Sequence, residues 1–190
     1  MSTQTSVGRG DRRNEQKLAT LDAEPQVPSR LRRAVARLAH QRWFAALGRR
    51  LAPVDRLLYR ATNGRLTIIG PQGAAMPPTL LLTTTGRRTG RLRSTPVMYV
   101  RDRERIVITS ESFGQKRPAA WPLNLDAHPR ARIQLASDTC RCQARRATAE
   151  ESARYWLRFV ELWPAHQSYS RRSGVRHMFI LEPTDVRATH

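Results

Sequence analysis

Leu80-Leu-Leu-Thr-Thr-Thr-Gly-Arg-Arg-Thr-Gly-Arg-Leu-Arg-Ser-Thr-Pro96 is the stretch of sequence that decides the fold. Its first half is typical of a strand with a buried face, and Gly86 and Gly90 then bracket a turn into a second strand. Glycines let the backbone bend and bring its N–H groups close to an anion. Four arginines lie in or beside the turn: Arg87, Arg88, Arg91 and Arg93. Because an arginine fork holds two phosphate oxygens, the turn predicts either a phosphate site or a plain solvated basic hairpin.

The whole chain is strongly basic. It has 190 residues, with 34 Lys+Arg against 15 Asp+Glu and a formal net charge of +19. The length fits one domain plus an extension, and the charge implies an anionic partner such as nucleic acid, a membrane surface or an acidic ligand. Aromatic residues make up only 6% of the chain, and the sequence contains no recognised nucleic-acid-binding motif. We therefore expect no nucleic acid partner.

Composition divides the chain into three parts. Residues 1–28 are polar and predict a disordered tail, residues 29–61 predict a basic helical extension, and residues 62–190 predict the core domain. The sequence has neither an apolar run of about 20 residues, which a spanning helix needs, nor a secretion signal. A cytoplasmic protein is the expectation.

The helical extension has an amphipathic pattern over residues 30–51, with apolar residues at helical spacing and arginines between them. Such a helix either lies on an anionic membrane, with Trp43 and Phe44 dipping in, or packs on its own domain with a solvated arginine face. Pro53 is expected to open a second short helix, which turns three apolar side chains inward: Val54, Leu57 and Leu58.

The core domain reads as short strands joined by hairpins, with two helices. Strands are expected at 79–85, 95–101, 106–110, 132–136, 139–147 and 177–182. One helix is expected at 119–126, and the capping box of Thr148 and Glu151 opens another, which Pro164 ends. The second helix is expected to bury one stripe: Trp156, Phe159, Val160 and Trp163. This order predicts a mixed α+β, mainly antiparallel fold, built as a small barrel.

Two classes of site are excluded by the sequence pattern. The chain has neither a dinucleotide-binding GxGxxG nor a P-loop motif. Cys140 and Cys142 lie two residues apart, on the same face of a predicted strand. Two thiols do not complete a tetrahedral metal site, so both are expected to be reduced strand residues and no metal is expected.

Further motifs follow the hairpin along the chain: Ala120-Trp121, Leu123-Asn124-Leu125, Pro129, Thr148-Ala-Glu-Glu151 and Trp156. With the hairpin they resemble the deazaflavin-dependent nitroreductase and quinone reductase family of actinobacteria, over roughly residues 62–183. The resemblance implies a split β-barrel related to flavin-binding oxidoreductases. It also implies that reduced coenzyme F-420 passes a hydride to a quinone, a nitro compound or a similar electron-poor acceptor. The phosphate and polyglutamate tail of that cofactor would suit the basic charge.

By position, the resemblance also implies site residues. Those assigned to the cofactor are Thr85, Gly86, Arg87, Arg88, Arg93, Thr95, Pro96, Ser110, Glu111, Gly114, Trp121 and Asn124. The three arginines among them would hold the phosphate and tail, and the loop from Ser110 to Gly114 would pass the deazaflavin ring. Tyr169 is the expected catalytic hydrogen-bond donor to the acceptor oxygen, with Ser112 as the second candidate.

Some positions depart from the family pattern. The Glu111-Ser-Phe-Gly114 loop lacks a cationic residue and carries the bulky Phe113, Pro122 replaces an aromatic residue, and His166 stands where a pocket tyrosine is expected. Three alternatives stay open: a non-catalytic split barrel that binds a lipid or the cofactor, a basic nucleic-acid-binding protein, and the same fold with FMN or haem. A quinone substrate would suit a peripheral position on the inner face of the cell membrane.

Overall fold

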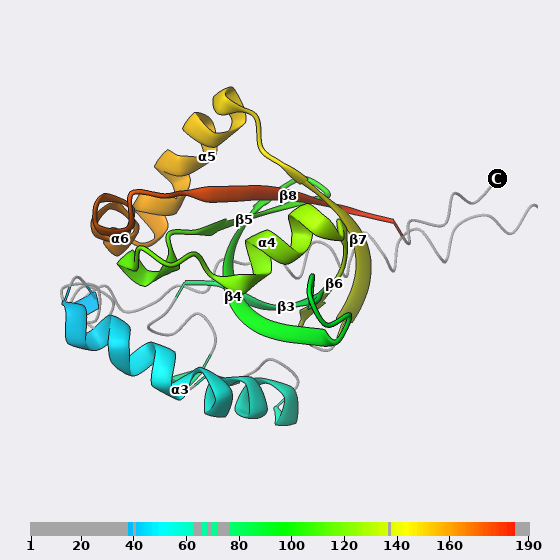
Figure 1. Ribbon diagram of the computed structural model, residues 1–190, viewed down its shortest axis with the longest axis horizontal. Coiled ribbons are helices and arrows are strands. Elements are labelled where there is room, and N and C mark those ends of the chain that lie inside the picture. Colours follow the sequence, from blue (N-terminus) through cyan, green and yellow to red (C-terminus); the bar gives the residue numbers. More distant parts are fainter. Residues whose placement is uncertain are drawn as a thin grey trace, which may run out of the picture.

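The computed structural model describes residues 38–39, 41–62, 66–67, 70–71, 77–136 and 138–184. At its centre lies a closed antiparallel barrel with the strand order β3-β4-β5-β8-β7-β6 (Figure 1). The strands are β3 (Thr79–Thr85), β4 (Leu92–Asp102), β5 (Arg105–Ser110), β6 (Arg130–Leu135), β7 (Asp138–Arg146) and β8 (His177–Pro183). β1 (Leu66–Thr67) and β2 (Gly70–Pro71) pair separately from the barrel. The expected mixed, mainly antiparallel fold is confirmed.

Apolar side chains fill the barrel interior, Ile108 and Phe179 among them. The helix α4 (Ala120–Ala127) adds Trp121 and Leu125 to the same core cluster, and the Trp121 ring meets Phe179 edge-on at 5.8 Å between centroids. Burying one large apolar side chain contributes about 1.5–3 kcal/mol, so this contact fixes α4 firmly to the barrel. Trp121 is therefore a core residue in this structure.

Strand β4 changes partner along its length. Residues 92–98 pair with β3, and residues 99–102 pair with β5. Pro96 lies in the first part, opposite Leu81 of β3, so its missing N–H is not needed by β5. The strand begins at Leu92 rather than at the expected Thr95, which places Arg93 on the barrel itself, opposite Thr84.

The helix α5 (Ala149–Leu162) begins with the predicted capping box. The Thr148 hydroxyl accepts a hydrogen bond from the Glu151 N–H at 3.2 Å, and the Glu151 carboxylate accepts one from the Thr148 N–H at 2.9 Å. The predicted buried stripe was right at Phe159 and Trp163, which are buried. It was wrong at Trp156 and Val160, which are only partly buried, and it missed the buried Tyr155. The reason is that α5 packs on the outside of the barrel, against β4, β5 and β8, through a face that includes Tyr155.

The helix α6 (Ala165–Ser173) was not predicted. Pro164 ends α5, as expected, but it is also the N-cap of α6, a place that proline suits because its φ is already helical. The α6 sequence is polar and shows no apolar periodicity, so its helical character left little signal. Its buried side chains are Ala165, His166, Tyr169 and Ser173.

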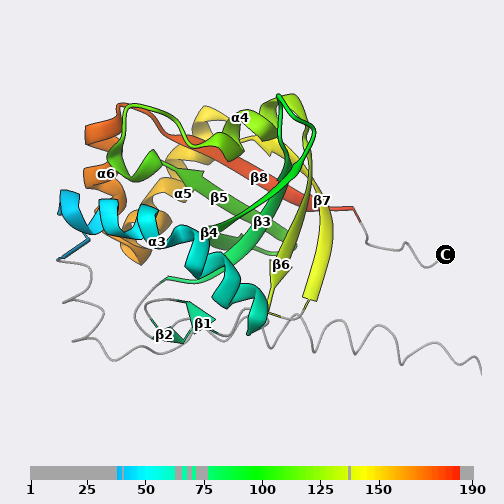
Figure 2. The ribbon, with the colours of Figure 1, turned by 60° about the horizontal axis from the view of Figure 1, so that its bottom comes forward.

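The helix α3 (Arg42–Ala61) runs without a break through Pro53, so the expected helix start at this proline was wrong. Figure 2 shows α3 lying along the side of the barrel, and one of its faces buries Tyr59 completely. The Tyr59 hydroxyl lies 3.2 Å from the Thr79 carbonyl oxygen of β3 and 3.1 Å from that of Gln134 on β6. This contact anchors the helix to two barrel strands.

The other face of α3 carries apolar side chains that are exposed: Trp43, Leu47, Val54 and Leu57. The prediction that Val54 and Leu57 turn inward was therefore wrong. None of the helices in the described ranges is long and apolar enough to cross a membrane. Two predicted parts lie outside the described residues. They are the expected disordered tail, 1–28, and residues 30–37 of the amphipathic segment.

The α5 capping box makes a testable pH prediction. Arg145 donates two hydrogen bonds of 2.8 Å to the Glu151 carboxylate, and with the Thr148 N–H they lower the pKa of Glu151 from 4.5 to about 2. A lowered folded-state pKa stabilises the fold above the unfolded pKa, and this contribution is lost as the pH falls through the folded pKa. Glu151→Gln should therefore destabilise the protein at pH 7, and the difference should shrink between about pH 4.5 and pH 2.

Urea unfolding of the wild type and Glu151→Gln at stepped pH values measures this difference. Glu161→Gln, which removes an exposed carboxylate from the same helix, controls for the loss of one negative charge. A stability difference that stays constant down to pH 2 would contradict the role of the Arg145–Glu151 pair.

Candidate functional site

The turn between β3 and β4 is closed by its own backbone. The Gly86 N–H donates to the Arg91 carbonyl at 2.9 Å, and the Gly90 N–H donates to the Gly86 carbonyl at 2.8 Å. Gly90 has a φ of +65°, which glycine adopts without strain. A Cβ on Gly86 would lie 3.0 Å from the Arg91 carbonyl oxygen, so the turn needs glycine at this position for space.

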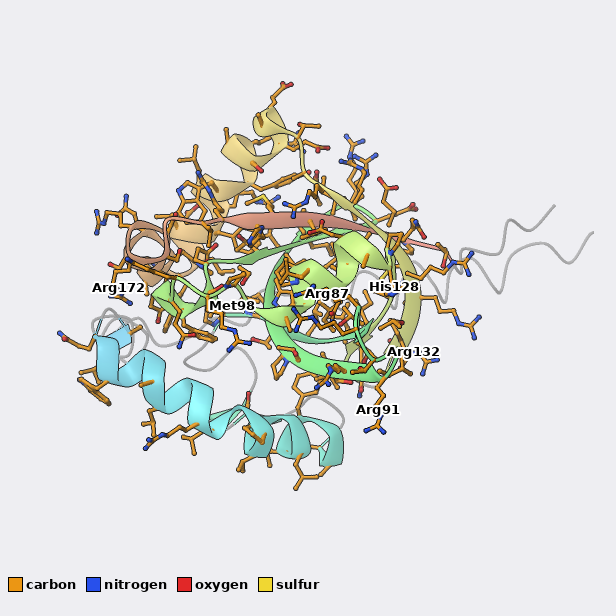
Figure 3. All side chains as sticks on the ribbon, viewed as in Figure 1. Arg87, Arg91, Met98, His128, Arg132 and Arg172 are labelled. Atoms are coloured by element: carbon orange, nitrogen blue, oxygen red, sulfur yellow. The ribbon has the colours of Figure 1, made fainter. Side chains whose placement is uncertain are left out.

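The arginines of this turn form an exposed cationic group, which we call the arginine turn: Arg87, Arg88, Arg91 and Arg93. In the part of the chain that the structure describes, none of the four forms an ion pair with a carboxylate. Figure 3 shows Arg87, Arg91 and Arg132 around one end of the barrel. Arg132 lies on β6, where it is paired with Thr83 of β3. Their N–H groups are therefore available to an anionic ligand.

Asn124 of α4 fixes the arginine turn. Its side-chain N–H donates to the Thr84 hydroxyl at 3.0 Å, and its carbonyl oxygen accepts from the Arg87 backbone N–H at 3.1 Å. Asn124 is only 4% exposed and its hydrogen bond to Thr84 is buried, so losing a partner of this side chain is costly. The expected cofactor residue Asn124 therefore lies at the turn and positions it.

Two further contacts hold α4 in place. The Ser112 hydroxyl accepts from the Ala119 N–H at 2.9 Å just before the helix begins. Near its end, Arg146 of β7 donates to the two carboxylate oxygens of Asp126 at 2.7 and 2.6 Å. The helix thus connects the arginine turn to the loop that follows β5.

That loop contains an unusual backbone turn, η1 (Ser112–Gly114). Ser112, Phe113 and Gly114 have φ values of +52°, +53° and +76°, so three successive residues are left-handed. This conformation is uncommon for serine and unusual for a bulky aromatic residue, and such turns concentrate at functional sites. The loop packs closely on α6, since a Cβ on Gly114 would lie 2.7 Å from the Arg172 side-chain nitrogen Nε.

A buried polar pair lies beside this turn. Nδ1 of His166 lies 2.6 Å from Oε2 of Glu111, and the two side chains are 5% and 3% exposed. The other oxygen of the Glu111 carboxyl accepts from the Thr109 hydroxyl at 2.6 Å. Nε2 of His166 is buried without a hydrogen-bond partner. The Glu111 side chain is thus committed to His166 and Thr109, while its backbone carbonyl accepts from the Gly114 N–H at 2.8 Å.

The two expected catalytic hydroxyls also have partners. Tyr169 is buried and donates to the Ala39 carbonyl at 2.8 Å, while its ring packs against Phe113 at 5.9 Å between centroids. Ser112 is buried and holds the Ala119 N–H. Ser112 is part of the loop and Tyr169 contacts it through Phe113, and the catalytic roles of both residues stay predictions.

Apart from Trp121, which lies in the barrel core, the expected site residues form two groups. Around the arginine turn lie Thr85, Gly86, Arg87, Arg88, Arg93, Thr95, Pro96 and Asn124. Around the loop lie Ser110, Glu111, Ser112, Gly114 and Tyr169. Sequence reasoning missed the hydrogen bonds that His166 and Thr109 make with Glu111, as well as the place of Arg132. His166 and Glu111 are 55 residues apart, so no local pattern could have paired them.

No group of three or more possible metal-binding side chains occurs in the described ranges. The donor set of the arginine turn fits a phosphate instead, because exposed guanidinium groups without carboxylate partners surround a turn too tight for a Cβ at Gly86.

A family model described as "F420H(2)-dependent quinone reductase" matches residues 53–181. The chain belongs to this F420H(2)-dependent quinone reductase family. The expected deazaflavin family is confirmed, and the protein is an oxidoreductase that depends on coenzyme F-420.

Relatives agree with this membership. The putative F420H(2)-dependent quinone reductase Rv3178 of Mycobacterium tuberculosis is 34% identical over 86 residues, which are 45% of this chain and 72% of that protein. The F420H(2)-dependent quinone reductase Rv1261c of the same species is 37% identical over 95 residues, which are 50% of this chain and 62% of that relative. The aligned stretch thus leaves more than a third of the second relative unmatched.

A solved structure supports the fold of the F420H(2)-dependent quinone reductase family for this chain. An F420-H2 dependent reductase (FDR-A) superimposes with a TM-score of 0.51 at 27% identity, over 55% of this chain and 94% of that one. The expected split-barrel fold is confirmed by this likeness and by the closed barrel β3-β4-β5-β8-β7-β6.

Proposed function

We propose that this protein reduces a quinone, or a similar electron-poor acceptor such as a nitro compound, with a hydride taken from reduced coenzyme F-420. The observation that carries the proposal is the arginine turn, four exposed arginines without carboxylate partners in the described part of the chain. The names of the relatives support a quinone as the acceptor.

In this proposal the arginine turn holds the acidic end of the cofactor. Arg87, Arg88 and Arg93 bind its phosphate and glutamate tail through charge-assisted hydrogen bonds. Backbone and neighbouring residues give the turn its shape: Thr85, Gly86, Thr95, Pro96 and Asn124. Asn124 holds the Arg87 backbone before any ligand arrives. The binding of the cofactor therefore costs little conformational entropy in the backbone of the turn.

The loop from Ser110 to Gly114 is proposed to pass the ring of the cofactor through backbone groups, with Trp121 at the edge of the barrel core beside it. The bound deazaflavin supplies the hydride. The protein supplies the position of the acceptor and a hydrogen bond to the oxygen on which charge develops. Tyr169 is the proposed donor and Ser112 the second candidate. To serve, the Tyr169 hydroxyl must exchange its present partner, the Ala39 carbonyl.

Titration of the purified protein with oxidised coenzyme F-420 and with FMN, followed by cofactor fluorescence, tests the proposal. Tight binding of coenzyme F-420 alone, together with oxidation of its reduced form by a soluble menaquinone analogue, is the expected result. A nitro compound tested in parallel separates the two acceptor classes. Binding of FMN in preference to coenzyme F-420, or binding without turnover of either acceptor, would overturn the proposed reaction.

We also propose that α3 docks the protein on an anionic membrane surface, from which a lipid-soluble quinone could be drawn. The exposed side chains Trp43, Leu47, Val54 and Leu57 are spaced i, i+4, i+11 and i+14, which places them on one helix face. The α3 sequence also has five arginines against one aspartate. Apolar side chains on one face, combined with positive charge, are typical of helices that lie in the membrane interface.

Leu47→Ser combined with Leu57→Ser should reduce binding to vesicles that contain anionic lipid by at least about tenfold, because each leucine loses apolar contact with the membrane. Sedimentation of protein with vesicles measures the bound fraction. Leu157→Ser is the matched control, since Leu157 on α5 is 71% exposed and Leu57 is 70% exposed. Unchanged binding of the double variant would refute docking through α3.

A further inference from the structure

The buried Glu111–His166 pair joins two elements that are distant in the sequence. Glu111 directly follows β5 and precedes the left-handed turn η1, whereas His166 lies in the first turn of α6. Three contacts show how this loop and this helix fit together, and the first is the 2.6 Å contact of the pair. The second is the ring contact between Phe113 and Tyr169, and the third is the close packing of Gly114 on Arg172. The loop is therefore held along its whole length by α6.

The hydrogen bond of this pair fixes the position of the loop relative to α6, which apolar packing alone would not do. Apolar side chains at these two positions could slide against each other, but a short hydrogen bond between two buried groups demands one register. The Thr109 hydroxyl holds the second carboxyl oxygen, so the carboxyl cannot rotate away from His166. Aromatic rings on three sides keep the His166 ring in place: Trp156, Phe159 and Tyr169.

The turn beside the pair needs such a restraint. Ser112 and Phe113 both occupy the left-handed region, which costs free energy for residues other than glycine and persists only where the surroundings impose it. The pair is a buried polar link between this loop and α6, and the bond from the Ala119 N–H to the Ser112 hydroxyl links the turn to α4.

We propose that Glu111 and His166 are a positioning pair for the reaction. Their hydrogen bond holds the Ser112–Gly114 turn in the left-handed shape against which the cofactor ring is proposed to lie. This inference rests on the proposed function, which places the ring at that turn. In this inference His166 positions the loop by holding Glu111, and it does not itself contact the reacting atoms. It also explains how two departures from the family pattern, at 111 and 166, occur together: each supplies the partner that the other needs.

The test compares variants that keep the packing but remove the hydrogen bond. Glu111→Leu combined with His166→Phe replaces the pair with apolar side chains of similar size. His166→Asn retains an N–H donor close to the position of Nδ1 and should rescue the effect. Two ligands are titrated by fluorescence: intact coenzyme F-420, and a deazaflavin fragment without the phosphate and glutamates. Hydrogen exchange of the peptide 109–119 reports the state of the loop without any ligand.

The double variant is expected to bind both ligands at least tenfold more weakly, and its 109–119 peptide should exchange at least tenfold faster. Arg87→Ala should weaken binding of the intact cofactor alone, because the fragment has no phosphate. The kcat of the double variant should also fall at saturating quinone, whereas a purely structural pair would leave kcat unchanged in the folded protein. Equal ligand affinity and equal exchange in the double variant would overturn the positioning role. Failure of the wild type to bind either ligand would overturn the proposed function and this inference together.

Discussion

Replacing Arg87 and Arg88 together with alanine is expected to weaken the binding of coenzyme F-420 by at least about a hundredfold. A hydrogen bond to a charged group contributes about 1.5–3 kcal/mol, and two are lost. Both arginines are exposed, so solvent and salt screen them, and we expect the lower end of the range. Fluorescence titration of the oxidised cofactor measures the effect. The thermal midpoint should barely change, because neither side chain is buried.

The matched control removes the same charge elsewhere. Arg158→Ala combined with Arg171→Ala takes two exposed arginines from α5 and α6, away from the arginine turn. If binding depends on the turn, this control variant should keep nearly all of its affinity. An equal loss in both double variants would mean that net charge, rather than the geometry of the turn, attracts the cofactor.

His166→Phe alone is expected to destabilise the fold by about 3 kcal/mol, because it leaves the Glu111 carboxyl buried without its main partner. Adding Glu111→Leu should recover most of this loss, since an apolar pair of similar volume is often as stable as a buried polar pair. The predicted result is strongly non-additive, as expected for two residues in direct contact. Urea unfolding of the two single variants and the double variant measures the three free energies.

Gln167→Phe serves as the control for placing an aromatic residue in α6, because Gln167 is an exposed neighbour of His166. It should leave the free energy of unfolding within about 0.5 kcal/mol of the wild type. If His166→Phe proves as stable as the double variant, Glu111 is satisfied without His166, and the pair has no part in holding the fold. In the predicted result, the double variant has nearly the wild-type free energy of unfolding but binds the cofactor ring weakly. Stability and cofactor binding are thus affected independently.

The parts of this protein that could be predicted from the sequence are those set by local chemistry. The hairpin was predictable because Gly86 and Gly90 mark the turn, and the start of α5 was predictable because Thr148 and Glu151 make a capping box. Each of these features depends on residues within a few positions of one another. The hairpin pairings β3–β4, β4–β5 and β6–β7 followed from their short connections, and the family followed from motifs whose spacing along the chain matches the family pattern.

Features that depend on contacts between distant segments could not be predicted. The face of α5 that is buried depends on where β4, β5 and β8 lie, and this buries Tyr155 in place of the expected Trp156. The helix α6 gave no apolar signal because it buries His166 and Tyr169, both with polar groups, against a loop. The direction of the apolar face of α3 depended on the anchor of Tyr59 to β3 and β6.

The sequence by itself determined the arginine turn, the antiparallel barrel and the family, because turn chemistry, strand alternation and spacing act over short distances. Only the tertiary structure decided that Asn124 holds the turn, that Glu111 meets His166, and that Tyr169 donates to Ala39. The physical reason is that a buried polar side chain takes whichever partner the fold brings within about 3 Å. That choice is made between segments 37, 55 and 130 residues apart, where local pattern carries no information.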